Sequence, residues 1–190
     1  PIETGVNLTL YDPAKEYGTP DDVQNIPHPI IGYMGTINST RLDGELLYQI
    51  ISQRPDYSFV FTGPEDDIFR RDRIHSLKND YFTGQKKVDE LPAYIAAYDV
   101  CINPQIDEYL AMGKPTVATS THTMRNIFTG HTHLAINPEE WLAAIDRAVT
   151  EADDKELAKQ RIAFAETHSW GHSVKKIYEI IDSFLKKKTT

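Results

Sequence analysis

The chain has 190 residues, of which 28 are acidic and 20 are basic, so its formal net charge at pH 7 is −8. This length suits one domain with a core of its own, and the negative charge argues against broad nucleic-acid binding, which needs a basic face. No apolar run reaches the length of a membrane span, and no signal-peptide pattern is present.

Residues 1–29 are rich in proline, glycine, aspartate and asparagine, without a regular apolar period, and they read as a linker leading into a domain. Because the chain opens on Pro1 without an initiator methionine, we expect it to be a fragment of a longer protein.

The first half of the domain alternates short apolar runs with helical patterns. Strands are predicted at 30–35, 57–61, 81–84 and 99–104, and helices at 42–51, 66–77 and 88–98. The third strand is brief, and the helix at 66–77 is polar. Cys101 lies in the fourth strand between Val100 and Ile102, so we expect a buried thiol that fits a reducing compartment.

The second half continues the alternation. Helices are predicted at 106–112, 138–149, 155–166 and 170–188, and strands at 116–119 and 133–136. Asn137 has the features of an N-cap, followed by a proline and a capping-box glutamate, Glu140. The spacing of strands and helices predicts an α/β fold with a doubly wound parallel sheet and right-handed crossovers, plus extra C-terminal helices.

The segment 106–119 carries the first candidate site. Gly113 is expected at the end of its helix, with Lys114 beside the negative helix end and Pro115 preventing continuation. Because ligands of open α/β sheets bind outside the carboxyl ends of strands, Glu108 is a candidate acceptor of hydrogen bonds from ligand hydroxyls. The alternative is that Glu108 is only a favourable charge in the first helical turn.

The turn 35–41 carries the second candidate site. Backbone N–H groups after Gly35, at Thr36 and Ile37, can bind an anion, and Arg41 adds a cation suited to phosphate oxygens. The glycine spacing of a Walker loop or a dinucleotide fingerprint is absent. The alternative is an ordinary polar loop with Arg41 paired to a neighbouring carboxylate, Asp43 or Glu45.

A third turn, with Gly84, Gln85 and Lys86, faces the same predicted sheet edge and can offer backbone groups to a flat base; the alternative is a solvated basic loop. No metal site is expected, because His131 and His133 have no further ligand at suitable spacing. No Gly-x-Ser-x-Gly nucleophile motif is present either.

Together these stretches resemble the C-terminal, donor-binding half of a retaining glycosyltransferase of the GT-B fold, in glycosyltransferase family 4. The resemblance covers nearly the whole chain in order. It is carried by Asn7, 11–13 (YDP), 31–35 (IGYMG), 59–64 (FVFTGP), 82–84 (FTG), 91–94 (LPAY), 99–104 (DVCINP), 108–115 (EYLAMGKP) and 168–170 (HSW).

The resemblance implies roles for the candidate residues. Glu108, with Tyr109 beside it, corresponds to the glutamate that binds the ribose of the nucleotide sugar, and Arg41 to a cation on the donor diphosphate. Thr36 stands where the family typically has a second cation, an arginine, so diphosphate binding is expected to be weaker or built differently.

The chain departs from this pattern in two further ways. The family has a longer loop before the Glu108 helix, with a residue that faces the sugar, whereas only Gln105 stands here between Pro104 and Ile106. We expect a mobile segment missing from the numbering rather than a deletion. The N-terminal domain, which in the family binds the acceptor, is also absent, so 1–29 would be the interdomain linker and 30–190 the nucleotide-sugar-binding domain.

The implied enzyme is a hexosyltransferase that moves a sugar from a nucleotide-diphosphate sugar to an acceptor hydroxyl, with no metal or other cofactor required. A glycan or lipid-linked acceptor in bacterial polysaccharide synthesis would bind through the missing domain. The expected location is cytoplasmic, with Lys186, Lys187 and Lys188 able to touch an anionic membrane face weakly. The alternatives are a nucleotide-sugar 2-epimerase and a non-catalytic flavodoxin-like module.

Overall fold

The structure, a computed structural model, describes residues 5–171, 174–175, 177–178 and 181. Within this range the strands are β1 (Ile30–Met34), β2 (Ser58–Thr62), β3 (Asp80–Gly84), β4 (Val100–Ile102), β5 (Thr116–Thr119) and β6 (His133–Ala135). The helices are α1 (Gly44–Ser52), α2 (Leu91–Ala97), α3 (Ile106–Ala111), α4 (His122–Ile127), α5 (Pro138–Thr150) and α6 (Lys155–Glu166), with short 3₁₀ helices η1 (Phe69–Arg71) and η2 (Arg73–Ser76).

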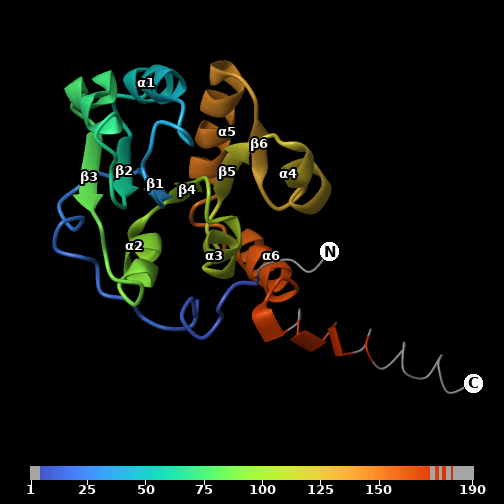
Figure 1. The fold of residues 1–190 in the computed structure, drawn as a ribbon. Coiled ribbons are helices and arrows are strands. Elements are labelled where there is room, and N and C mark those ends of the chain that lie inside the picture. Colours follow the sequence, from blue (N-terminus) through green and yellow to red (C-terminus); the bar gives the residue numbers. More distant parts are fainter. Residues whose placement is uncertain (1–4, 172–173, 176, 179–180, 182–190) are drawn as a thin grey trace, which may run out of the picture.

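The strands form one sheet in the order β3-β2-β1-β4-β5-β6, and every pairing is parallel. The chain therefore builds outward from β1 to one edge, returns, and builds from β4 to the other edge (Figure 1). This arrangement confirms the predicted doubly wound, Rossmann-like α/β fold. The point where the direction reverses, between β1 and β4, is where such sheets open a crevice at their carboxyl ends.

Helices cover both faces of the sheet. Figure 1 shows α1 and α5 on one side and α2, α3 and α6 on the other. Successive side chains of a strand point to opposite faces, so Ile31 and Tyr33 of β1 join the core beneath α1 and α5, while Ile30 and Met34 join the core beneath α2 and α3. Strands buried on both faces explain why the sequence shows apolar runs rather than alternation.

Three local predictions were wrong. The polar segment 66–77 forms η1 and η2 instead of one helix, because Asp72 is extended and its carboxylate accepts the N–H of Ile74, which starts a new turn. Val88 is 66% exposed and lies before α2, which begins at Leu91 and not at residue 88 as predicted. The ammonium of Lys114 donates to the carbonyls of Ala96 and Tyr98 at the end of α2, not to the end of α3.

Other predicted details are confirmed. Gly113 has a φ of 73° and follows Met112, the C-cap residue of α3. Asn137 caps α5, with its side chain accepting the N–H of Glu140 while the Glu140 carboxylate accepts the N–H of Ile136. Cys101 is fully buried, and burial raises the pKa of its thiol to about 12.

The expected mobile segment between Gln105 and Ile106 is not there. Gln105 is the N-cap residue of α3, its carbonyl accepts the N–H of Tyr109 at 3.0 Å, and the chain runs from Pro104 directly into the helix. The loop before α3 is therefore short, and the prediction of a missing stretch was wrong.

Residues 5–29 run over the α2, α3 and α6 side of the sheet. Val6, Tyr11, Val23 and Ile26 are buried in the same core as α2 and α3, so this segment packs on the domain. Most of the predicted helix at 170–188, including Lys186, Lys187 and Lys188, lies outside the described residues. None of the helices in the described part of the chain combines the length and apolar character needed to cross a membrane.

Candidate functional site

The turn after β1 and the helix after β4 meet at the reversal point of the sheet. A side chain added to Gly35 would lie 3.3 Å from the ring of Pro104, so the two connections touch. Tyr109 also holds the two connections together, because its hydroxyl accepts the N–H of Met34 at 2.9 Å and donates to the carbonyl of Asn103 at 3.3 Å. The first two candidate regions of the sequence are thereby brought together.

Glu108 lies in the first turn of α3 and is half-buried. Burial raises the pKa of its carboxyl group, and the carboxylate in turn adds to the raised pKa of the buried Tyr11 hydroxyl. Its side chain makes no ion pair within the described residues, and a hydrogen bond from its own backbone N–H only partly offsets the effect of burial on the pKa. A partly desolvated carboxylate that receives no hydrogen bond from another described residue is well suited to accept hydrogen bonds from ligand hydroxyls.

Arg41 is exposed at the same edge of the sheet, close enough to Tyr33 to affect the pKa of its hydroxyl. Neither carboxylate considered as its partner pairs with it: Asp43 caps α1, and Glu45 pairs with Arg73. Within the described residues Arg41 has no ion pair, so its guanidinium is available to an anion.

The backbone of the turn 35–41 is less open than the sequence suggests. The N–H of Gly35 donates to the carbonyl of Thr62, and the N–H of Ile37 donates to the carbonyl of Pro64. A side chain on Gly63 would lie only 1.8 Å from the carbonyl oxygen of Gly35, so the next turn is pressed against this one. Thr36 is exposed, and its N–H makes no hydrogen bond within the described part of the chain.

Two predicted ligand-binding side chains are engaged in the fold itself. Tyr109 is fully buried, with its hydroxyl occupied as described above. The ammonium of Lys86 pairs with Asp22 at 2.6 Å and lies over the ring of Tyr94, which itself donates to Asp22. Lys86 thus attaches the N-terminal segment to the domain, while Gly84, with a φ of 72°, and Gln85 are exposed beside it.

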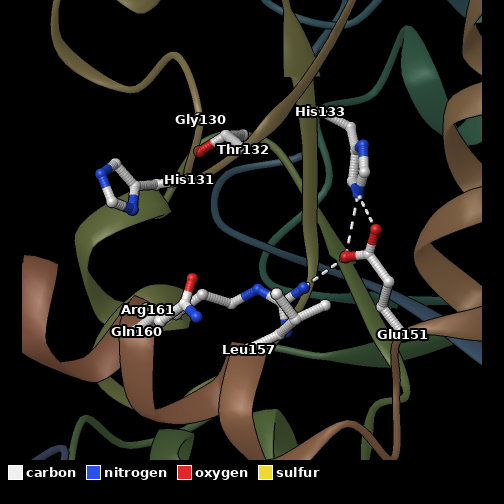
Figure 2. A pocket seen from close by; sticks show the side chains of 8 residues that line it. All are labelled: Gly130, His131, Thr132, His133, Glu151, Leu157, Gln160 and Arg161. Atoms are coloured by element: carbon white, nitrogen blue, oxygen red, sulfur yellow. Dashed lines mark hydrogen bonds and ion pairs between the residues drawn. The ribbon is translucent and has the colours of Figure 1, made fainter.

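A separate polar pocket of about 170 Å³ lies at the opposite, amino-terminal end of β6 (Figure 2). At its centre Glu151 pairs with His133, at 3.1 Å, and with the buried guanidinium of Arg161. His131 lies apart and stacks on Phe164 with ring centres 3.8 Å apart. The charges are balanced internally, so this cluster holds α5 and α6 together. Among the described residues no group of three or more potential metal ligands gathers.

Sequence reasoning missed how the turn 35–41 is held. Asp66 accepts the N–H of Ser39 at 3.0 Å and that of Phe69 at 2.6 Å, which connects the turn to η1. The hydrogen bonds from these N–H groups lower the pKa of Asp66. Nothing in the sequence separates this aspartate from a solvated turn residue.

Comparison with known proteins identifies the family. Residues 28–151, well over half of the chain, match the family described as glycosyl transferases group 1. A relative named as the teichuronic acid biosynthesis glycosyltransferase TuaH, from Bacillus subtilis (strain 168), is 25% identical over 188 residues, which cover 89% of this chain and 47% of the relative.

Solved structures share the fold. The sucrose-phosphate synthase of Thermosynechococcus elongatus superimposes with a TM-score of 0.75 at 19% identity, over 98% of this chain and 52% of that one. Anabaena Alr3699/HepE in complex with UDP gives a TM-score of 0.73 at 16% identity, over 94% of this chain and 56% of that one. A glycosyltransferase from Rickettsia africae ESF-5 gives a TM-score of 0.72 at 21% identity, over 97% of this chain and 57% of that one.

The chain spans about half the length of the relatives it matches. The family match covers well over half of the chain, and the solved structures share its fold. The chain belongs to the glycosyl transferases group 1 family.

Proposed function

We propose that this chain is the C-terminal, donor-binding domain of a retaining GT-B glycosyltransferase of family 4. The whole enzyme would transfer a hexosyl group from a nucleotide-diphosphate sugar to an acceptor hydroxyl. One observation carries the proposal: an unpaired guanidinium, Arg41, and an unpaired, half-buried carboxylate, Glu108, follow the two strands between which the sheet reverses.

The two side chains match the two ends of a nucleoside diphosphate. Arg41 would donate paired hydrogen bonds to the diphosphate oxygens. Glu108 would accept hydrogen bonds from the ribose hydroxyls. Since the N–H groups of Gly35 and Ile37 are occupied by backbone carbonyls, only that of Thr36 is free in this part of the turn to assist. Arg41 therefore carries most of the anion binding.

In the proposed reaction the sugar–phosphate bond breaks and the acceptor oxygen bonds to the same face of the sugar. The acceptor proton passes to the departing diphosphate, and Arg41 stabilises the negative charge that develops there. The acceptor, a glycan or a lipid-linked glycan, would be held by a further domain. We expect this chain alone to bind the donor without turning it over, and we expect no metal to be required.

The names of similar proteins support this proposal. Structures of Anabaena Alr3699/HepE contain UDP or UDP-glucose, and the name of TuaH places that relative in teichuronic acid biosynthesis. We accordingly propose a role in bacterial polysaccharide synthesis in the cytoplasm, with weak contact to the inner membrane face.

Calorimetric titration of the chain with UDP, GDP and ADP tests the proposal. We expect one of them to bind and Arg41→Ala to weaken it by about tenfold or more, the effect of losing a charge-assisted hydrogen bond. Arg147→Ala, which removes an exposed cation from α5, is the matched control. Equal affinity of Arg41→Ala and the wild type would exclude Arg41 from the site.

Glu108 is tested by comparing ribose and 2′-deoxyribose forms of the nucleotide that binds. The wild type should prefer the ribose form, and Glu108→Ala should lose that preference while Glu166→Gln, an exposed carboxylate on α6, retains it. If Glu108→Ala discriminates between the two sugars as the wild type does, the carboxylate has no role in ribose recognition.

A further inference from the structure

A second cavity opens at the carboxyl edge of the sheet, on the side of α1 and α5. It has a volume of about 310 Å³ and lies over the ends of β1, β4 and β5. Arg41 belongs to its lining, so it adjoins the proposed diphosphate site. Leucine and isoleucine side chains of α1 and β4 make much of its wall, and the exposed Ile136 lies at its rim. We call it the α1–α5 cavity.

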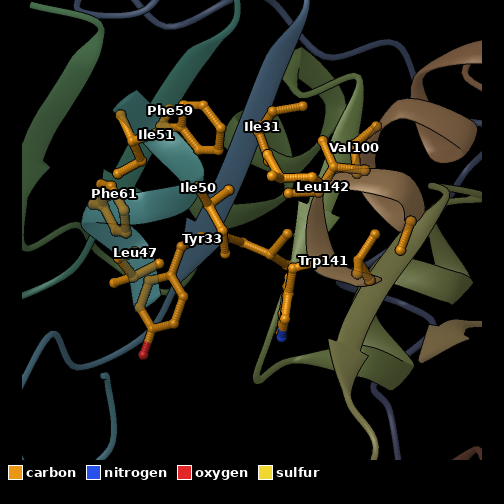
Figure 3. Packing of buried hydrophobic residues seen from close by; sticks show 14 of the residues in the cluster. Ile31, Tyr33, Leu47, Ile50, Ile51, Phe59, Phe61, Val100, Trp141 and Leu142 are labelled. Atoms are coloured by element: carbon orange, nitrogen blue, oxygen red, sulfur yellow. The ribbon is translucent and has the colours of Figure 1, made fainter. Parts of the chain in front are cut away.

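Trp141 of α5 lines this cavity and is only 4% exposed, yet its indole Nε1–H has no acceptor within the described residues. Figure 3 shows this nitrogen at the end of the indole that points away from the packed aliphatic side chains, toward the same side as the hydroxyl of Tyr33. A buried donor without an acceptor is costly, so a ligand that supplies one is favoured.

Other polar side chains around the cavity already make hydrogen bonds within the fold. The Tyr33 hydroxyl donates to the carbonyl of Thr36 at 3.0 Å, and the amide of Asn103 donates to the hydroxyl of Thr119 at 3.0 Å. Two donors make no hydrogen bond or ion pair within the described residues: the neutral N–H of Trp141 and the cationic guanidinium of Arg41. Together they call for a ligand with an anionic group at one end, oxygen acceptors at the other, and apolar faces between them.

A monosaccharide attached to a phosphate has this chemistry. Its hydroxyl and ring oxygens accept hydrogen bonds, and its C–H faces suit an apolar wall. The volume is near the lower end of the range for ligand pockets, about 300–1,000 Å³, which suits one ring rather than a whole nucleotide sugar.

The sugar and the nucleoside are attached to opposite ends of the diphosphate, and they would lie toward opposite faces of the sheet. Glu108 belongs to α3, on the face opposite α1 and α5. With the ribose at Glu108 and the diphosphate at Arg41, the group on the far phosphate extends toward the α1–α5 cavity. We propose that this cavity binds the transferred sugar, with the indole N–H of Trp141 donating to a sugar oxygen. This inference rests on the proposed function.

The test compares nucleoside diphosphates with their glucose conjugates by calorimetry on the full chain, using UDP, GDP and ADP and the corresponding nucleotide glucoses. Trp141→Phe keeps an aromatic ring and removes the donor. We expect it to weaken binding of the nucleotide sugar by about fivefold while the affinity for the nucleoside diphosphate stays within about twofold. Trp170→Phe, at a position 51% exposed, is the matched control.

A second variant guards against a folding defect in Trp141→Phe. Ile136→Trp adds bulk at the rim, where the native side chain is 66% exposed. Like Trp141→Phe, it should weaken the binding of the nucleotide sugar more than the binding of the nucleoside diphosphate. If both variants change the affinities for the two ligands equally, or leave the affinity for the nucleotide sugar unchanged, the sugar does not bind in this cavity. Failure of the proposed function looks different: the wild type binds no nucleotide, or Arg41→Ala and Glu108→Ala have no effect.

Discussion

At the scale of single residues, Tyr109 shows how one hydroxyl sets the geometry of the site. It is fully buried and connects the last residue of β1 to the residue after β4, the two points from which the candidate ligand groups extend. Its contribution is to position the turn 35–41 and α3 relative to each other.

Tyr109→Phe should therefore destabilise the protein although it removes only one oxygen. The buried N–H of Met34 would lose its 2.9 Å acceptor, which costs about 1–3 kcal/mol. The free energy of unfolding from urea titration measures this loss. Tyr48→Phe is the control, because the Tyr48 hydroxyl makes no hydrogen bond within the described residues, and its effect should stay within about 0.5 kcal/mol. Equal stability of Tyr109→Phe and the wild type would refute this role.

The sequence predicted Glu108 and Arg41 as candidate groups, and neither makes an ion pair within the described residues. It could not show that Tyr109, the next residue along the helix, turns about 100° away from Glu108 into the core. Nor could it show that Trp141, one member of an apolar stripe, keeps a donor without an acceptor. Both properties depend on neighbours from distant elements.

At the scale of elements, the link between α1 and α5 is a paired set of hydrogen bonds. Arg54, just after α1, donates from Nε to Asp146 Oδ1 at 2.7 Å and from an Nη to Asp146 Oδ2 at 2.5 Å, and the Tyr57 hydroxyl adds a third bond at 3.2 Å. This set fixes one end of the helix pair whose other end frames the α1–α5 cavity.

Asp146→Asn should lower stability at pH 7 by roughly 0.5–1 kcal/mol, because solvent screens this partly exposed pair. The hydrogen bonds from Arg54 lower the pKa of Asp146 in the folded state. Its contribution is therefore complete above the unfolded value of about 3.9 and is lost as the pH falls through the lower folded value.

Urea titrations between pH 7 and pH 3.5 measure the difference in unfolding free energy between the wild type and Asp146→Asn. This difference should be constant down to about pH 5 and become smaller below it. Glu139→Gln, an exposed change on the same helix, should show no such narrowing. A gap that is independent of pH would mean that the carboxylate charge contributes nothing.

Elements with a strong apolar pattern were predicted well, and the polar helix α6 was also predicted, but the polar segment 66–77 and the short helix α4 were not. Strands β1, β2 and β4 are buried on both faces, so their apolar runs stand out. Helix α4, which the sequence did not indicate, has no buried residue and is begun by Thr121, whose hydroxyl accepts the N–H of Met124. A short helix of this kind depends on its cap rather than on a periodic stripe, which periodicity alone cannot detect.

At the scale of the whole molecule, alternation of strands and helices predicts a parallel sheet but leaves the strand order open. The observed order puts β1 beside β4, and this single adjacency brings the turn 35–41 next to α3. The N-terminal segment, expected as a linker, packs on the opposite side from the α1–α5 cavity. The carboxyl edge between them is where the proposed donor binds.

Hydrogen–deuterium exchange of the chain, with and without a saturating concentration of the nucleoside diphosphate that binds, tests this location most directly. We predict slower exchange in peptides that cover 35–42 and 104–112. The peptides that cover 130–133 and 157–161, at the opposite edge, should not change. Protection confined to that opposite edge, or binding without protection at 35–42 and 104–112, would contradict a donor site at the reversal point of the sheet.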